Sequence, residues 1–286
     1  MSPPRNAIAL CVAWMSGALF SFTAMAVAAR ELSHDMGTFQ MLVVRSSFGV
    51  VLVTLLLARG GFAQLRLAHL KLHATRNVIH FGGQLGWFYA ISLIPLATVF
   101  AIEFTAPLWT AVFAAIFLRE RLTAARVAAV VLGIAGVLLI LRPGLATVEP
   151  AALAILAGAL AFGLTHVVTK KLSSRDSPLC ILFWMSFMQF VLALGPALAQ
   201  WTPLAAAQWP WVLVLGVTGV GAHFFMVNAL ACADATVVVP LDFLRLPLIG
   251  LLGWLYYGEA IDGWLIVGAV LILAGNAVSL WRENRR

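Results

Sequence analysis

Three ionisable side chains lie deep within apolar stretches of this sequence, where few other groups can do chemistry. Glu103 and Asp242 are carboxylic acids, and Arg245 follows Asp242 by three residues, which places these two on one face of a helix. A charge at the centre of a membrane-spanning helix costs about 2.5–3.5 kcal/mol, so such residues are candidates for function. Because a guanidinium can donate two parallel hydrogen bonds to a carboxylate, Arg245 is the candidate to bind an anionic group of a substrate. A purely structural Asp242–Arg245 pair is the alternative.

A fourth charge, Arg45, lies at a depth similar to that of Glu103. We expect these two residues to form an ion pair, because pairing neutralises two costly charges. Other polar and aromatic residues within apolar stretches are expected to line a cavity. They are His80, Gln84, Trp87, Tyr89, Trp109, His223 and Asn228. A histidine there could carry a proton, but we interpret these histidines, with His166, as hydrogen-bond partners between helices.

Other chemistries find little support. The cysteines Cys11, Cys180 and Cys232 are far apart and form no CxxC pair, so neither a disulfide framework nor a zinc site is expected. The sequence has no glycine-rich phosphate loop with a lysine, which argues against ATP hydrolysis. We therefore expect no cofactor, no metal and no enzymatic activity. A membrane-embedded enzyme that modifies lipids is the remote alternative, and it would need clustered acids or histidines at a membrane face.

Composition places the chain in a lipid bilayer. Hydrophobic residues make up 63% of the sequence and charged residues 10%, against about 25% charged in a typical soluble domain. A spanning helix needs roughly 20 mainly apolar residues. Ten such stretches are present: Ala7–Ala29, Gly37–Ala58, Ala74–Ile94, Ala97–Leu118, Thr123–Leu141, Ala151–Val168, Pro178–Ala199, Trp209–Leu230, Ala235–Tyr257 and Gly263–Trp281. We expect an all-α bundle of ten transmembrane helices, since helices pair their own backbone polar groups.

Lysine and arginine predict the orientation of the bundle. Most of the 18 Lys and Arg residues share one side of the membrane, and the segments on the other side hold only Arg30 and Arg142. Positive residues accumulate in the cytoplasm, so both termini are expected there, in a bacterial-type inner membrane. We interpret the net charge of +7 as this orientation signal and expect no nucleic-acid partner.

The sequence repeats itself at an offset of 139 residues. Under this offset Glu103 matches Asp242, and Glu120 matches Glu259. These matches are informative because acids are rare in so apolar a chain. Prolines interrupt the matching stretches at Pro107 and around Asp242, and we expect them to kink the helices.

The repeat divides the chain into residues 1–144 and 145–286, with five predicted spans in each half. Five is an odd number, so the second half must enter the membrane inverted relative to the first. Inverted repeats around a central cavity are typical of alternating-access transporters, which bind their substrate near the membrane midplane. An old duplication retained only for packing is the alternative.

The order of these motifs resembles the EamA-type drug/metabolite transporter superfamily. The resemblance rests on Pro107–Glu120, on Pro240–Pro247 running to Gly258-Glu259, and on the glycine-rich fifth and tenth spans. It implies a ten-helix basket with a central cavity that moves amino acids or other metabolites, often outward. Arg119 stands where the family commonly has glycine, so we interpret Glu120 as an ion-pair partner in a loop.

We therefore expect an exporter of small metabolites, with amino acids as the first candidates. Arg245 would hold the carboxylate of the substrate, and Glu103 or Asp242 its ammonium group. A larger cofactor-like metabolite, such as riboflavin or S-adenosylmethionine, is the alternative substrate. The expected partners are the substrate, the lipid bilayer and protons as a coupling ion, and the chain is expected to function as a monomer.

The predicted topology can be tested by labelling single cysteines in a background without the native ones. Arg66→Cys and Lys171→Cys should react with a membrane-impermeant thiol reagent only from the cytoplasmic side. Thr147→Cys and Thr202→Cys should react only from the outside. Labelling of Arg66→Cys and Thr147→Cys from the same side would contradict the inverted repeat.

Overall fold

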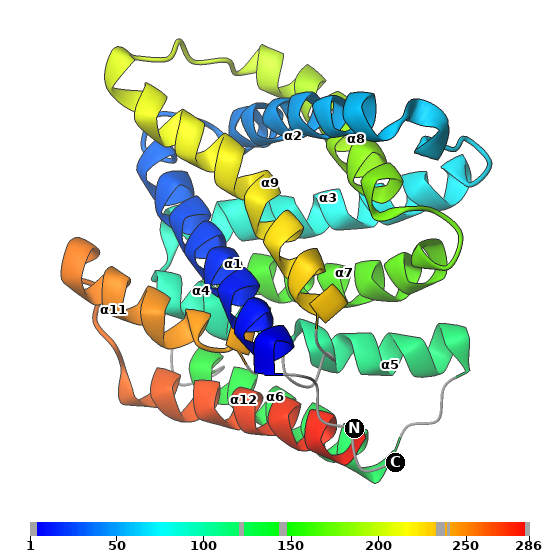
Figure 1. Ribbon diagram of the computed structural model, residues 1–286. Helices are drawn as coiled ribbons and strands as arrows, with labels where there is room; N and C mark the ends of the chain where they lie inside the picture. The colour runs from blue at the N-terminus through cyan, green and yellow to red at the C-terminus, as the bar shows by residue number, and fades with distance from the viewer. Residues whose placement is uncertain (1–4, 120–122, 143–147, 233–237, 239–240, 284–286) are drawn as a thin grey trace.

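The computed structural model describes residues 5–119, 123–142, 148–232, 238 and 241–283, and every regular element among them is helical (Figure 1). The α-helices are α1 (Arg5–Leu32), α2 (Thr38–Gly60), α3 (Leu70–Leu93), α4 (Leu96–Glu103), α5 (Ala106–Leu118), α6 (Ala124–Leu141), α7 (Pro150–Ser173), α8 (Pro178–Ala199), α9 (Trp209–Cys232), α11 (Arg245–Tyr257) and α12 (Gly263–Glu283). Two short 3₁₀ helices, η1 (Phe62–Gln64) and η2 (Ala206–Gln208), precede α3 and α9. Glu120, Thr147 and Pro240 lie outside the described residues.

Seven stretches of the described residues are long and apolar enough to cross a membrane. They are Leu10–Leu32, Thr38–Gly60, Leu96–Leu118, Ala124–Leu141, Pro150–Ser173, Pro178–Ala199 and Ala206–Met226. The chain is therefore an all-α, multi-pass membrane protein, as its composition predicts. Ten spans are not confirmed: α3 is long but carries many polar residues, the described apolar part of α12 is short, and part of the ninth predicted span is not described.

The fourth predicted span is a broken helix. α4 ends at Glu103 and α5 begins at Ala106, with Pro107 in its first turn. A proline has no N–H to donate to the preceding turn, so the backbone there needs another partner. The amide Nδ2 of Asn276 in α12 donates to the carbonyl oxygen of Phe104 at 2.8 Å. The predicted interruption is confirmed, and Asn276 stabilises it.

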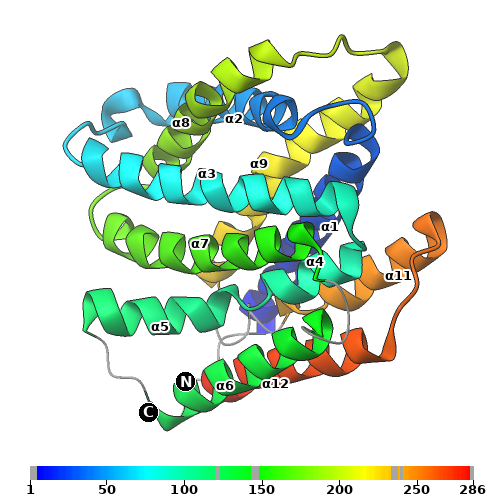
Figure 2. The ribbon, with the colours of Figure 1, turned by 180° about the vertical axis from the view of Figure 1, so that it is seen from behind.

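The helices pack mainly as four pairs: α1 with α9, α3 with α7, α2 with α8, and α6 with α12. Figures 1 and 2 show α2 and α8 on one side of the bundle and α6 and α12 on the opposite side, with the other two pairs between them. The start of α1 and the end of α12 point toward the end of the bundle where α2 joins α3 and α7 joins α8. That these two helix ends point the same way agrees with the predicted topology, and the cytoplasmic location of the termini stays a prediction.

Two glycines on α3 have different surroundings. A Cβ on Gly86 would overlap the carbonyl oxygen of Ala154 in α7, whereas a Cβ on Gly82 would meet no atom within 4 Å. Of these two glycines, Gly86 therefore permits the close approach of α3 to α7 and Gly82 does not contribute to it. The pair is spaced like a dimerisation motif, but Gly86 serves packing within the bundle.

Alanine substitutions at these two glycines should have different effects on stability. Gly86→Ala should lower the free energy of unfolding in detergent by about 1–3 kcal/mol, because the backbones of α3 and α7 must move apart. Gly82→Ala is the matched control on the same helix, and it should be neutral or stabilising, since alanine favours helix by about 1 kcal/mol over glycine. Equal loss in both variants, measured by thermal unfolding, would contradict this packing.

Candidate functional site

Arg245 lies between two carboxylates that come from different halves of the chain. Its Nη2 is 3.0 Å from Oδ2 of Asp242 and 3.5 Å from Oε1 of Glu103. Nε1 of Trp87 donates to the other oxygen of Glu103, Oε2, at 2.7 Å. Glu103 ends α4 and Arg245 begins α11, so these charges meet where helices start and stop. One arginine facing two acids leaves one negative charge in excess when both acids are ionised. We call Glu103, Asp242 and Arg245 the charged triad.

Aromatic rings surround the guanidinium of Arg245, which is only 5% exposed. Its Cζ lies 4.4 Å from the ring centroid of Phe22, 5.0 Å from that of Phe104 and 5.2 Å from that of Phe100. Phe104 also packs edge to face against Phe243, its partner in the sequence repeat, with centroids 5.5 Å apart. Cation–π attraction strengthens when such a cation is shielded from water. The rings therefore help to stabilise the positive charge of Arg245, which is shielded from water.

The predicted Arg45–Glu103 ion pair is wrong. Nη1 of Arg45 contacts Oε1 of Gln189 at 3.5 Å, and Nη2 lies 3.4 Å from Nε2 of His223. Glu103 pairs with Arg245 instead, because the break before α11 brings that arginine to the end of α4. Similar depth along two helices did not reveal which side chains face each other.

A third buried arginine is Arg76, which lies near the start of the third predicted span. The structure places it within α3, 7% exposed. Its guanidinium donates to Oγ1 of Thr169 at 2.8 Å and to Oδ1 of Asn77 at 2.8 Å, and contacts Sδ of Met185 at 3.8 Å. Among the described residues, no carboxylate pairs with Arg76 or Arg45. The bundle thus contains two cationic groups whose described partners are neutral.

Polar and aromatic side chains form one buried stripe along α3. They are His73, Asn77, His80, Gln84 and Trp87. Steps of four and three residues keep them on one face of the helix, and each is at most 9% exposed. These polar side chains account for the modest hydropathy of α3, and each of them is buried against neighbouring helices. Sequence reasoning missed Asn77, although its helical spacing from His80 and Gln84 could have revealed it.

The histidines behave differently from one another. His166 lies 3.2 Å from Oγ1 of Thr110, and His223 contacts an arginine, so both are partners between helices as expected. His80 does not fit that expectation, because both of its ring nitrogens are buried without a hydrogen-bond partner. Oε1 of Gln84, one turn further along α3, is also buried and unpaired. Buried polar atoms are normally paired, so these groups are ready to bind water or a solute.

Two predicted cavity residues lie away from this polar stripe. The side chain of Tyr89 is 42% exposed, and Asn228 donates to the carbonyl of Phe224 in its own helix at 2.8 Å. Neither residue joins the buried stripe, and their place in a cavity stays a prediction.

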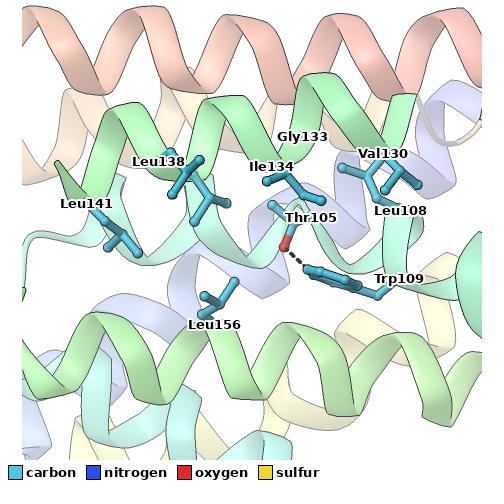
Figure 3. Close-up of a pocket in the computed structure, with 10 residues that line it drawn as sticks. Thr105, Leu108, Trp109, Val130, Gly133, Ile134, Leu138, Leu141 and Leu156 are labelled. Atoms are coloured by element: carbon cyan, nitrogen blue, oxygen red, sulfur yellow. Dashed lines mark hydrogen bonds between the residues drawn. The ribbon is translucent and has the colours of Figure 1, made fainter. Parts of the chain in front are cut away.

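Trp109 lines a separate apolar pocket of about 220 Å³ (Figure 3). Figure 3 shows side chains of α6 on one side of the pocket and Leu156 of α7 on the other. Nε1 of Trp109 donates to Oγ1 of Thr105 at 3.2 Å, so its one polar group is already engaged. The pocket offers contact with apolar groups only, and the predicted central cavity stays a prediction.

A polar network joins three segments where α1 and α11 end and α4 begins. Arg30 at the end of α1 pairs with Oε1 of Glu259, while Oε2 accepts from the backbone N–H of Leu96 at 2.8 Å. The hydroxyl of Tyr257 donates to Oε1 of Glu31 at 2.8 Å. Glu259 thus ties the loop after α11 to α1 and to the start of α4, which closes this end of the bundle.

The EamA-like transporter family matches the sequence twice, over residues 9–142 and again over residues 149–281. The chain belongs to this family. The resemblance drawn from the motifs is confirmed, and the protein is a membrane transporter of small metabolites.

Curated relatives carry several substrates. A riboflavin transporter from Rhizobium johnstonii is 34% identical over 231 residues, which are 80% of this chain and 76% of the relative. An S-adenosylmethionine uptake transporter from Rickettsia felis is 24% identical over 96% of this chain and 93% of the relative. The pseudopaline exporter CntI of Pseudomonas aeruginosa is 26% identical over 94% of both chains. A solved crystal structure shares the fold, with a TM-score of 0.68 at 21% identity over 96% of this chain and 98% of that one.

The network at Glu259 predicts a measurable stability difference. Glu259→Gln removes the ion pair with Arg30 from a mostly buried site, and should lower the free energy of unfolding by about 1–3 kcal/mol. Asp262→Asn is the matched control, because its partner Arg142 and Asp262 itself are 36% and 42% exposed. Exposed pairs contribute about 0–1 kcal/mol, so this variant should unfold like the wild type. Equal unfolding temperatures for the two variants would contradict the role of Glu259.

Proposed function

We propose that this EamA-like protein transports a cofactor-like metabolite with a heteroaromatic ring, with riboflavin as the first candidate. The main support for this proposal is a set of buried polar groups that have no hydrogen-bond partner. Nε of Arg45, both nitrogens of His80, Oε1 of Gln84 and Nε2 of Gln189 all lack partners. A site with such groups binds a solute that forms hydrogen bonds with them much more tightly than one that does not, because a buried polar group without a partner costs free energy.

The length of the polar stripe favours an elongated solute. From Asn77 to Trp87 along α3 the rise is about 15 Å, at about 1.5 Å per residue. An amino acid, the first expectation from the sequence, is much shorter than this distance. The dione edge of a flavin ring has carbonyl oxygens for Arg45 and an N–H for Gln84, and its ring faces suit aromatic neighbours such as Phe162, which packs 5.4 Å from His80. The riboflavin transporters among the relatives support the same choice.

The charged triad belongs to the coupling step in this proposal. Glu103 comes from the first half of the chain, whereas Asp242 and Arg245 come from the second. If the halves are inverted repeats that rock against each other, the distances from Arg245 to the two acids must change. The excess negative charge gives a proton a place to bind, which would link transport to a pH gradient. Arg245 is already paired with two acids, so Arg45 is the better candidate to contact the substrate.

S-adenosylmethionine is the second candidate substrate. It carries a sulfonium and an ammonium group, and the excess acidic charge of the triad favours a cation at that place. Uptake transporters for this molecule are among the full-length relatives. The two candidates differ in charge: S-adenosylmethionine would place a cationic group near the charged triad, whereas riboflavin would not.

Proteoliposomes distinguish these candidates directly. Riboflavin transport in both directions can be followed by its fluorescence, with and without a pH gradient. Lumichrome, which keeps the ring but lacks the ribityl chain, should compete with riboflavin, whereas ribitol should not. Saturable transport of S-adenosylmethionine without riboflavin transport would select the second candidate. Saturable transport of amino acids alone would contradict the proposal and restore the expectation drawn from the sequence.

Arg45→Lys tests the proposed substrate contact. Lysine keeps the positive charge but loses the planar fork of donors, so the ratio kcat/KM for riboflavin should fall by about tenfold or more. Arg59→Lys, at the exposed end of the same helix, is the matched control and should transport like the wild type. Both variants should insert and unfold normally. Unchanged kcat/KM in Arg45→Lys would remove this residue from the substrate site.

A further inference from the structure

A cluster of metal-binding side chains lies where α3 and α8 begin, apart from the charged triad. One ligand atom from each of His73, Asp176 and Cys180 lies within 4.8 Å of the other two. Nε2 of His73 is 3.1 Å from Oδ2 of Asp176. Nδ1 of His69 is 3.1 Å from the same oxygen, so a second imidazole faces the cluster.

Each half of the cluster comes from the start of one helix. His69 lies in the turn before α3 and His73 in its first turns, whereas Asp176 lies in the turn before α8 and Cys180 in its first turn. The sequence shows only isolated cysteines, so the spacing of cysteines alone predicts no site. The packing of α3 against α8 brings the two pairs together.

Burial of the cluster makes its polar groups costly unless something binds them. The side chains of His73 and Asp176 are fully buried, as is Cys180, while His69 is 27% exposed. Nδ1 of His73 has no hydrogen-bond partner. Sγ of Cys180 lies 3.9 Å from the carbonyl oxygen of Arg66, which is a weak contact. The partly exposed His69 gives an ion a way in from solvent.

We propose that His69, His73, Asp176 and Cys180 bind one Zn²⁺ ion per chain. Two imidazoles, a carboxylate and a thiolate are ligand types that Zn²⁺ takes in tetrahedral sites, whereas Mg²⁺ and Ca²⁺ prefer oxygen alone. Bond lengths of about 2.0–2.3 Å set tetrahedral ligands about 3.3–3.8 Å apart. The two histidine nitrogens that face Asp176 are each 3.1 Å from its Oδ2, and Sγ of Cys180 is within 4.8 Å of the ligand atoms of His73 and Asp176. The thiolate and the carboxylate together balance the charge of the ion. The bound ion ties α3 of the first half to α8 of the second.

Cobalt titration of the purified, full-length protein tests this site, because Co²⁺ replaces Zn²⁺ and is coloured. After treatment with a chelator and a reductant, the protein should bind one Co²⁺ with the visible bands of tetrahedral cobalt and a near-ultraviolet thiolate-to-cobalt band. Added Zn²⁺ should abolish both. The double variant Cys11→Ser, Cys232→Ser, which leaves Cys180 as the only cysteine, is the matched control and should give the same spectrum. Absence of the thiolate band from the wild-type protein would overturn the proposal.

Two variants identify the ligands. Cys180→Ser should lose the thiolate band and bind Co²⁺ about tenfold or more weakly, and a band that survives in this variant would refute the site. His69→Ala changes a partly exposed residue, so it should fold even if Cys180→Ser does not. It should keep the thiolate band and bind Co²⁺ about tenfold more weakly. Unchanged affinity would mean that the cluster is only a hydrogen-bonded contact between α3 and α8.

Discussion

The cost of burying charge is the constraint on which this structure depends. Arg245 lies in an apolar interior, and it is tolerated because Glu103 and Asp242 flank it and aromatic rings cover it. An ion pair of this kind contributes little net stability, but removing one partner leaves an expensive unpaired charge. The helices must therefore stop and start at the correct places, and the breaks before α5 and α11 do this. The Asn276 contact with the backbone of Phe104 and the packing of Phe104 on Phe243 both stabilise these breaks.

The second constraint is the polar stripe on α3. Its buried side chains reduce the hydropathy of the helix, so α3 depends on packing against α7 and α8 for its place in the bundle. Gly86 permits that packing with α7, and Asn77 strengthens it with α8 by donating to the carbonyl of Trp184 at 3.1 Å. The unpaired polar atoms of His80 and Gln84 are then a stability cost that a bound solute can offset. Stability and substrate recognition thus compete along one helix.

The sequence predicted the features that follow from the repeat and from the rarity of charge. The family, the helical membrane fold, the broken fourth span and the Asp242–Arg245 contact follow from those patterns. The partner of Arg45, which depends on helix rotation, was not predicted: this arginine contacts Gln189 and His223. The cluster around Cys180 was not predicted for another reason. Its members come from two distant parts of the sequence and meet only because α3 packs against α8.

The most direct test of the central role of Arg245 is the free energy of unfolding in detergent, measured in two backgrounds. Removing both acids together, with Glu103→Gln and Asp242→Asn, should lower it by about 3–5 kcal/mol when Arg245 is present, because the guanidinium is left buried and unpaired. In an Arg245→Met background the same two substitutions should raise it, because two buried acids otherwise lack their cation. This reversal of sign is the expected result. A loss of similar size in both backgrounds would contradict the account.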